Sequence, residues 1–140
     1  MNADARPRPL PRPTPTTQPF WDGAKKKKLM LQYDPVSRRY QFWPRSCSVR
    51  TGKRNLKWQQ VSGKGTLYSF TETHVPTAGF EGKTPYLIGL VELDEGVRII
   101  ANLVNVTIDQ IEIGMKMKVA WEELSDDINY FAFEPAKKLK

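Results

Sequence analysis

Short apolar segments separated by turn-forming residues make up most of the chain after residue 58, and this pattern constrains the fold more than any other feature. The segments show no helical periodicity except at residues 107–110, where one helical turn begins, so we expect strands. Asp94-Glu95-Gly96 is typical of a hairpin turn, with a glycine available for positive φ. The strands are expected at residues 58–73, 86–93, 97–102, 115–121 and 128–133. Five short strands, with a helical turn between the third and the fourth, are typical of an OB barrel.

The residues before this barrel predict an arm, a short helix and a small lobe of hairpins. Residues 29–58 alternate aromatic or aliphatic side chains with polar ones, as half-buried hairpin strands do. Thr17 and Pro19 favour the N-cap and the first turn of a helix. Residues 1–18 alternate Arg and Pro, contain almost nothing apolar, and predict a segment that is disordered or extended in isolation. Four cations fall near the C-terminal end of the helix, namely Lys25, Lys26, Lys27 and Lys28.

Basic residues are concentrated in the first part of the 140-residue chain. Residues 1–58 carry 14 Lys and Arg against 3 Asp and Glu, whereas residues 59–140 carry 8 against 12. The formal net charge of +7 therefore combines +11 in the first part with −4 in the second. This asymmetry fits a polyanionic ligand or an acidic partner on the N-terminal side. A single cysteine and the lack of an apolar run of about 20 residues make the cytoplasm the expected compartment, with no membrane partner.

Residues able to support catalysis are scarce, and no catalytic residue is predicted. His74 is the only histidine and Cys47 the only thiol, and nothing in their spacing brings them together. Gly63-Lys64-Gly65-Thr66 lacks the four-residue spacer of a phosphate-binding loop. Nucleic-acid binding is disfavoured, because the two strands that would carry stacking platforms offer one aromatic residue and one cation. The residues alone indicate a small, non-catalytic, mostly β binding protein.

Several motifs, each weak alone, are specific in combination. The N-terminal motifs are Pro19-Phe20-Trp21-Asp22-Gly23, Leu31-Gln32, Tyr40-Gln41-Phe42, Pro44-Arg45, Leu56 and Trp58. The C-terminal motifs are residues 62–71, His74, residues 85–96 and Ile113-Gly114-Met115. With these motifs the chain resembles the zinc-ribbon/OB-fold acyl-CoA-associated proteins, domain of unknown function family 35. The resemblance implies a mostly β fold with a short N-terminal helix, a rubredoxin-like or zinc-ribbon-like hairpin lobe and a five-stranded OB-fold barrel.

The metal of that family is not expected here. A zinc ribbon needs two hairpins that each present two thiolates about three positions apart. The matching positions are Asp34 and Ser37 in one hairpin and Ser48 and Thr51 in the other, and Cys47 lies one place outside this frame. Hydroxyl groups with ordinary pKa values cannot replace thiolates as soft, charged ligands. We therefore expect a metal-free lobe with no zinc and no permanently bound cofactor, stabilised by burial of its aromatic residues against the barrel.

The resemblance implies a non-catalytic accessory subunit that helps a thiolase-superfamily enzyme to bind or channel an acyl-CoA substrate. The alternatives are a stand-alone acyl-CoA-binding protein and, third, a single-stranded nucleic-acid-binding OB protein. If CoA binds, its phosphates are expected to meet the basic lobe. The candidate residues are Arg38, Arg39, Arg45 and Arg50, with Lys25 to Lys28 behind them. An equally open interpretation is that these cations are solvated or pair with the acidic residues of a partner.

The expected second barrel strand indicates a covered surface. Residues 86–91 are apolar on both faces, although an exposed barrel strand alternates with polar residues. We expect the chain's own lobe or helix, or another subunit, to cover the outer face. The candidate interface residues are Phe42, Trp43, Tyr86, Ile88 and Leu90. The expected organisation is an arm at residues 1–18, a helix and lobe at 19–57, an OB barrel at 58–135 and a basic tail at 136–140.

Overall fold

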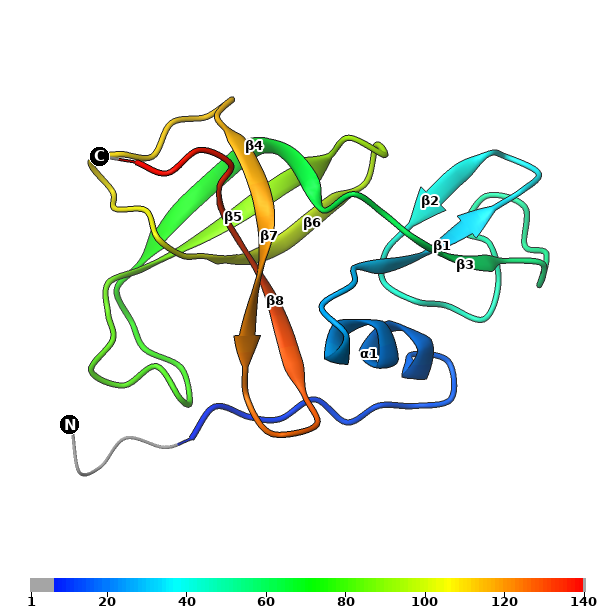
Figure 1. Ribbon diagram of the computed structural model, residues 1–140, viewed down its shortest axis with the longest axis horizontal. Helices are drawn as coiled ribbons and strands as arrows, with labels where there is room; N and C mark the ends of the chain where they lie inside the picture. The colour runs from blue at the N-terminus through cyan, green and yellow to red at the C-terminus, as the bar shows by residue number, and fades with distance from the viewer. Residues whose placement is uncertain (1–6, 140) are drawn as a thin grey trace.

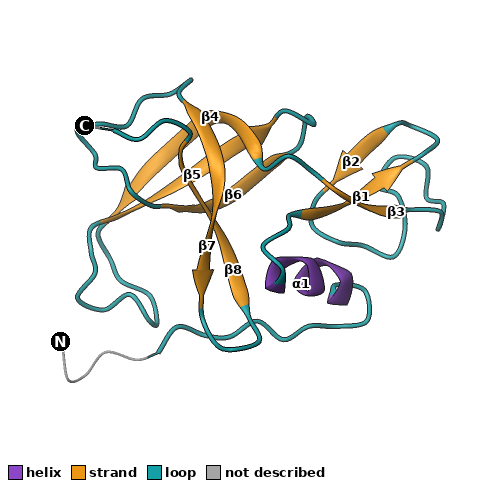
Figure 2. Cartoon of the chain, viewed as in Figure 1, coloured by secondary structure: helices purple, strands orange, loops and turns teal. Residues whose placement is uncertain are grey.

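Two β structures lie side by side in the computed structural model, which describes residues 7–139 (Figures 1 and 2). The first is a small sheet that we call the lobe, residues 29–60, and the second is a barrel. The elements are α1 (Gln18–Lys25), β1 (Met30–Asp34), β2 (Arg39–Gln41), β3 (Lys57–Gln60), β4 (Lys64–Thr73), β5 (Tyr86–Leu93), β6 (Arg98–Leu103), β7 (Lys116–Glu123) and β8 (Asn129–Pro135). The prediction of a mostly β fold with a short N-terminal helix is confirmed.

The lobe is an antiparallel sheet in the order β2-β1-β3. Tyr33 of the central strand β1 pairs with Tyr40 of β2 on one side and with Lys57 of β3 on the other. Helix α1 contacts both β1 and β8, so it lies where the lobe meets the barrel (Figure 1). Pro19 stands at the start of this helix, where a missing N–H is not needed for helical hydrogen bonds.

The barrel is closed and has the strand order β4-β5-β6-β8-β7, which confirms the predicted five-stranded OB-type architecture. β4 pairs with both β5 and β7, and its register against β5 shifts between Leu67 and Ser69, as in a β-bulge. β6 and β8 run parallel and pair only at Leu103 and Phe133, so they diverge over the rest of their length. Five residues at the centre of the barrel are fully buried, namely Leu67, Val91, Ile99, Met117 and Phe133.

One expectation about local structure needs correction. The first expected strand, residues 58–73, is in fact two strands, because Gly63 adopts a φ of +73° between β3 and β4. The chain therefore passes from the lobe to the barrel at this glycine. Residues 107–110 form a single turn between β6 and β7 that is closed by the Ile111 N–H on the Thr107 carbonyl, at 3.1 Å, as the expected helical turn requires.

Aromatic rings fill the contact between α1, the lobe and the barrel. Phe20 of α1 is 1% exposed, and its ring centroid lies 5.3 Å from that of Trp43 and 5.8 Å from that of Phe131 on β8. Trp21 and Phe42 complete the contacts of Phe20, at 5.0 and 5.9 Å. Because these rings come from three parts of the chain, their burial joins the lobe to the barrel.

The described part of the N-terminal arm lies against the barrel. Residues 7–17 follow the barrel surface towards α1 (Figure 1), and Arg8 forms an ion pair with Glu122 of β7. Residues 1–6 of the expected disordered arm lie outside the described residues. No helix within residues 7–139 has the length and apolarity needed to cross a bilayer.

Candidate functional site

A groove of about 440 Å³ separates the lobe from the β5–β6 hairpin of the barrel. The lobe contributes Tyr40, Arg45 and Arg50 to its walls, and the barrel contributes Glu92 and Arg98. Three arginines therefore line one hollow whose walls include a single acidic residue, Glu92. Such a concave, positively charged surface is suited to an anion with several charges.

Two buried glutamines position the loop that carries Arg45. The Gln32 side chain donates to the Arg45 carbonyl at 2.7 Å and accepts from the Arg45 N–H at 2.8 Å. The Gln41 side chain donates to Gln32 at 3.1 Å and accepts from the Val49 N–H at 3.0 Å. These side chains are 4% and 5% exposed, so the hydrogen bonds are shielded from water and hold residues 42–49 as a defined wall of the groove.

The barrel side of the groove carries an ordered arginine. The Arg98 Nε donates to Glu92 at 2.8 Å, and the Arg98 Cζ lies 3.8 Å from the centroid of the Tyr68 ring. The hydrogen bond with Glu92 is the main cause that raises the pKa of Arg98, so this group stays charged. The Arg50 side chain donates to the Tyr40 carbonyl at 3.3 Å, and within residues 7–139 neither Arg45 nor Arg50 forms an ion pair. The lobe side of the groove therefore keeps its positive charge for a ligand.

A buried carboxylate joins the two turns at the far end of the lobe. Asp34 is fully buried and accepts from the Ser48 hydroxyl at 2.6 Å and from the Ser37 hydroxyl at 2.9 Å. It also accepts from the Val36 N–H at 2.9 Å, and the Ser48 oxygen accepts in turn from the Thr51 N–H at 3.2 Å. We call this hydrogen-bonded set the clasp. The hydrogen bond from Ser48 is the main cause that lowers the pKa of Asp34 to about 2, against burial, which raises it.

The clasp occupies the four positions that were compared with zinc ligands. Asp34 and the hydroxyls of Ser37 and Ser48 already bind one another, and the Thr51 hydroxyl accepts from the Lys53 N–H at 3.3 Å. This donor set contains no thiolate or imidazole and therefore does not fit zinc. Within residues 7–139 no group of three or more His, Cys, Asp or Glu side chains could hold a metal ion.

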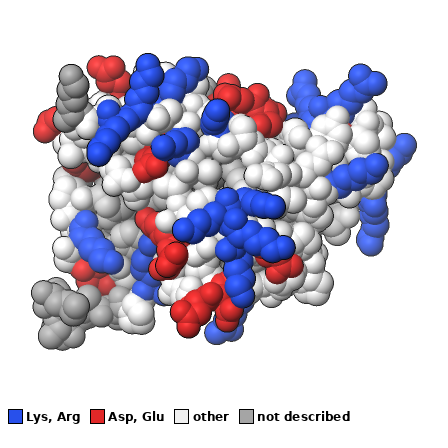
Figure 3. Space-filling view, in the orientation of Figure 1, with Lys and Arg blue, Asp and Glu red and all other residues white. Residues whose placement is uncertain are grey.

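The basic residues proposed from the sequence fall into four separate places. Arg45 and Arg50 line the groove, whereas Arg38 and Arg39 lie at the β1–β2 turn and are exposed. Lys25 and Lys27 form ion pairs with Asp127 at 2.9 Å and Glu123 at 3.6 Å, beside the β7–β8 turn. Lys26 and Lys28 line a different hollow, next to α1. On the face shown in Figure 3, the basic side chains over the lobe, at the right, lack acidic neighbours, whereas those over the barrel alternate with acidic ones.

The proposed interface residues are also divided. Phe42 and Trp43 pack on Phe20 and Phe131, although 40% of Trp43 remains exposed. Tyr86, Ile88 and Leu90 are half-buried on the outer face of β5. Phe80 stacks on Tyr86 with 4.5 Å between the ring centroids, and Arg8 and Pro9 of the N-terminal arm line one hollow together with Ile88. The arm and the β4–β5 loop therefore cover part of this face, in place of the expected lobe or helix.

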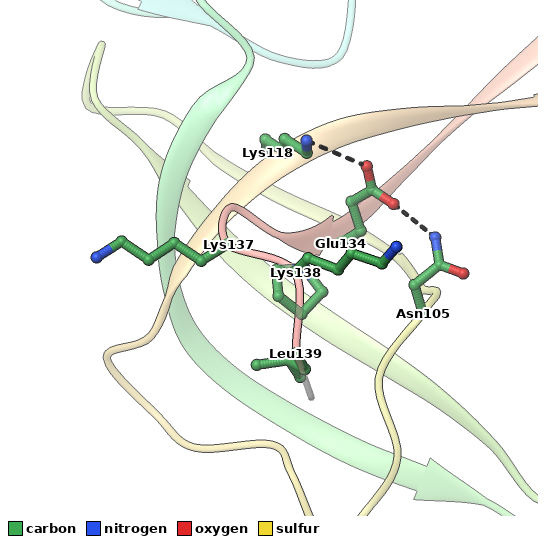
Figure 4. Close-up of a pocket in the computed structure, with 7 residues that line it drawn as sticks. Asn105, Lys118, Glu134, Lys137, Lys138 and Leu139 are labelled. Atoms are coloured by element: carbon green, nitrogen blue, oxygen red, sulfur yellow. Dashed lines mark hydrogen bonds and ion pairs between the residues drawn. The ribbon is translucent and has the colours of Figure 1, made fainter.

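A second hollow, near the C-terminal tail, does not resemble a catalytic site. It measures about 550 Å³ and is lined mainly by charged side chains near the C-terminal tail (Figure 4). Glu134 accepts a hydrogen bond from Asn105 at 2.5 Å and forms an ion pair with Lys118 at 3.7 Å. Its carboxylate is therefore already bound by residues of the hollow. His74 lies elsewhere, 68% exposed, and pairs with Glu72 at 2.9 Å.

Sequence reasoning does not identify Arg98 as a residue of the groove. Arg98 is the single cation of its strand, and its contribution to the groove depends on the pairing of β5 with β6, which places Glu92 opposite it. No local pattern marks this position, because the partner wall of the groove comes from a loop about fifty residues earlier. The exposed Tyr68 ring, which stacks against Arg98, comes from β4 and is likewise brought there only by the fold.

Comparisons with known proteins agree with this architecture. The family model "ChsH2, C-terminal OB-fold domain" matches residues 58–122. A solved structure described as "Ltp2-ChsH2(DUF35) aldolase" has a TM-score of 0.81 and 29% identity, and the match covers 91% of this chain and all of that chain. A "Probable enoyl-CoA hydratase alpha subunit" from Thermomonospora curvata is 33% identical over 94% of this chain, which spans only 40% of that relative.

A shorter relative shows the family directly. It is a "DUF35 domain-containing scaffold protein" from Methanothermobacter thermautotrophicus, and it is 33% identical over 95 residues. The match covers 64% of this chain and 71% of the archaeal protein. With this coverage, and with the same lobe and barrel as the solved structure, the chain belongs to the DUF35 family.

Proposed function

We propose that this chain is a non-catalytic accessory subunit of an enzyme that acts on acyl-CoA, and that the groove between lobe and barrel receives the phosphates of the CoA. The observation that carries the proposal is the convergence of Arg45, Arg50 and Arg98 on one hollow. Free CoA has roughly four negative charges, and guanidinium groups bind phosphate oxygens with two parallel hydrogen bonds. The chain offers a binding surface without a nucleophile or a general acid–base pair beside it.

The relatives support a function that depends on a partner. The solved relative is described as an aldolase named for two proteins, Ltp2 and ChsH2, and the archaeal relative is named a scaffold protein. The Thermomonospora relative is named as one subunit of a hydratase. For this chain we propose a thiolase-superfamily partner, as its resemblance to the acyl-CoA-associated proteins implies.

The exposed apolar residues favour the outer barrel face and Trp43 as the surface that meets this partner. Ile100 on β6 is 63% exposed beside the half-buried Ile88 and Leu90, with which β6 is paired across the sheet. An apolar strip on a pleated sheet surface is typical of an interface core. The β5 residues identified from the sequence therefore remain in the proposal, and Ile100 joins them.

The experiment is purification of the tagged, full-length chain from its own cells, followed by mass spectrometry and size-exclusion chromatography. We expect a thiolase-fold enzyme in a stoichiometric complex. Ile100→Asp should remain folded and release the enzyme, because an interface would bury an unpaired charge. Ile113→Asp is the matched control, since Ile113 is 66% exposed on a loop away from this strip. A wild-type chain that elutes alone as a monomer would contradict the proposal.

A stand-alone acyl-CoA-binding protein remains the second candidate, because the same groove would serve it. The purification experiment distinguishes the two candidates. A stand-alone protein would bind CoA and would be purified from its own cells without an enzyme, whereas an accessory subunit would be purified with one. Nucleic-acid binding has less support, since the Tyr68 ring is already stacked against Arg98 and the barrel part of the sequence is net acidic.

A further inference from the structure

Arg8 lies in surroundings that are unusual for an arginine on a terminal arm. Its side chain is only 20% exposed and forms an ion pair with Glu122. The Arg8 Cζ lies 5.0 Å from the centroid of the Phe80 ring and 5.9 Å from that of the Tyr130 ring. The guanidinium group thus has a carboxylate for its charge and aromatic rings for its planar faces.

The two rings are held in place by other aromatic residues. Phe80 stacks on Tyr86, with 4.5 Å between centroids and 28° between planes. Tyr130 stacks on Phe131, with 5.0 Å and 12°. Phe131 is 1% exposed and belongs to the barrel core. The Tyr130 ring is therefore anchored on the barrel core, and the Phe80 ring on Tyr86 of β5.

Gly79 allows the arm to approach closely. A Cβ at this position would lie 2.4 Å from the Arg8 Cα and 2.8 Å from the Arg8 nitrogen, which no real side chain tolerates. Gly79 also has a φ of +87°, a conformation that favours glycine. The backbone of Arg8, and not only its side chain, is thus accommodated by the β4–β5 loop.

The arm residues next to Arg8 cover an apolar hollow. Arg8 and Pro9 line a space of about 320 Å³ together with Ile88, Ile100 and Tyr130. This space lies at the seam where β6 and β8 diverge, since these strands pair only at Leu103 and Phe133. When Arg8 is bound, the arm therefore lies across the gap between β6 and β8 and covers part of the hollow.

We propose that Gly79, Phe80, Glu122 and Tyr130 form a binding site for the guanidinium group of an arginine in an extended, proline-flanked segment, and that Arg8 of the chain's own arm is its ligand. We call this site the cage. Pro7 and Pro9 restrict the backbone on both sides of Arg8 to extended conformations, which reduces the entropy lost when the arm binds. A lysine would keep the charge but lose the planar group that fits beside two rings.

The arm supplies a matched control for a test on the full chain. Arg12 is also flanked by prolines, but it is exposed and forms no ion pair within the described residues. Amide nuclear Overhauser effects from ¹⁵N relaxation report mobility at residues 8, 10 and 12, because the prolines between them lack an N–H. In wild type and Arg12→Ala we expect residues 8 and 10 to be as rigid as the barrel.

In Arg8→Ala and Arg8→Lys the same two amides should reach the values of a mobile chain, and the Gly79 amide should shift. The barrel resonances away from the cage should stay unchanged, which separates release of the arm from unfolding. A mobile arm in the wild type, or an arm that stays rigid in Arg8→Ala, would overturn the proposal. A rigid arm in Arg8→Lys would also overturn it, because the site would then recognise charge and not a guanidinium group.

Discussion

The lobe and the barrel are filled in opposite ways. Among residues 7–139, four of the five buried polar side chains belong to the lobe, namely Gln32, Asp34, Gln41 and Ser48. The barrel interior is made of aliphatic and aromatic side chains that are completely buried, such as Val91 and Phe133. No buried side-chain nitrogen or oxygen in the described part of the chain lacks a hydrogen-bond partner, so the polar interior of the lobe is fully satisfied.

This difference shows how a sheet of three short strands can keep a defined shape. The lobe is too small to enclose an apolar core of its own. Its outer end is fixed by the clasp around Asp34, and its inner end is fixed by aromatic rings that pack on α1 and the barrel. The loop between these two ends carries Arg45 and Arg50. The positions of these arginines in the groove therefore depend on the clasp and on the aromatic contacts.

The largest effect is expected from the ring that joins the two regions. Phe20→Ala removes contacts with four other rings and should lower the free energy of unfolding by about 3–5 kcal/mol. Leu67→Ala in the barrel centre is the comparison, with an expected loss of about 2–5 kcal/mol. Hydrogen exchange should separate them: Phe20→Ala should lose protection first in β1–β3, and Leu67→Ala first in the barrel. Equal loss in both regions for both variants would mean that lobe and barrel are one cooperative unit.

The second largest loss of stability is expected from a change in the clasp. Asp34→Ala leaves the Ser48 and Ser37 hydroxyls without their acceptor, and we expect the melting temperature to fall by roughly 10 °C. Thr51→Ala is the control, because its hydroxyl accepts only from the Lys53 N–H at 3.3 Å and should matter little. If both variants melt alike, the clasp does not hold the lobe.

The same carboxylate predicts a pH dependence that is confined to acid. The pKa of Asp34 is about 2 in the folded chain and ordinarily 3.8, so the stability it contributes is complete above the ordinary value. This contribution is lost as the pH falls from about 4 towards 2. Denaturation curves across that range should show a steeper loss of stability for wild type than for Asp34→Asn. Parallel slopes would indicate that other carboxyl groups dominate.

Treatment with a metal chelator should not change the stability of the protein. The oxygen atoms of the clasp form hydrogen bonds with one another, and the clasp contains no thiolate. We therefore expect the purified protein to contain no stoichiometric zinc and to keep the same melting curve in a strong chelator. Elemental analysis and circular dichroism provide the measurement. About one zinc per chain, together with melting on chelation, would show that the lobe is closed by a metal.

The sequence predicts the barrel well because strand alternation and turn residues are local signals. It does not predict the break at Gly63, where backbone conformation decides whether residues 58–73 form one strand or two. The position of the arm also escapes prediction, because the partners of Arg8 lie far along the chain, at Phe80 and Glu122. These are tertiary contacts that no sequence period records.

The candidate site was predicted only in part for the same reason. Charge concentration identifies Arg45 and Arg50, but the same reasoning groups them with lysines that turn out to pair with the β7–β8 turn. The residues of the clasp were recognised as poor zinc ligands. Their binding to one another depends on the meeting of two turns that are 14 residues apart, at Asp34 and Ser48.

The claim that the lobe presents a phosphate-binding wall is tested most directly by calorimetric titration of CoA into the isolated full-length chain. The double variant Arg45→Ala/Arg50→Ala should bind CoA roughly tenfold more weakly, which corresponds to about 1.4 kcal/mol. Rising salt concentration should lower the affinity of the wild type for CoA. Arg38→Ala/Arg39→Ala removes the same charge from the exposed β1–β2 turn and should leave the affinity within about a factor of two, since an exposed charge outside the groove contributes little. No binding by wild type, or equal affinity in both double variants, would contradict the assignment of the groove.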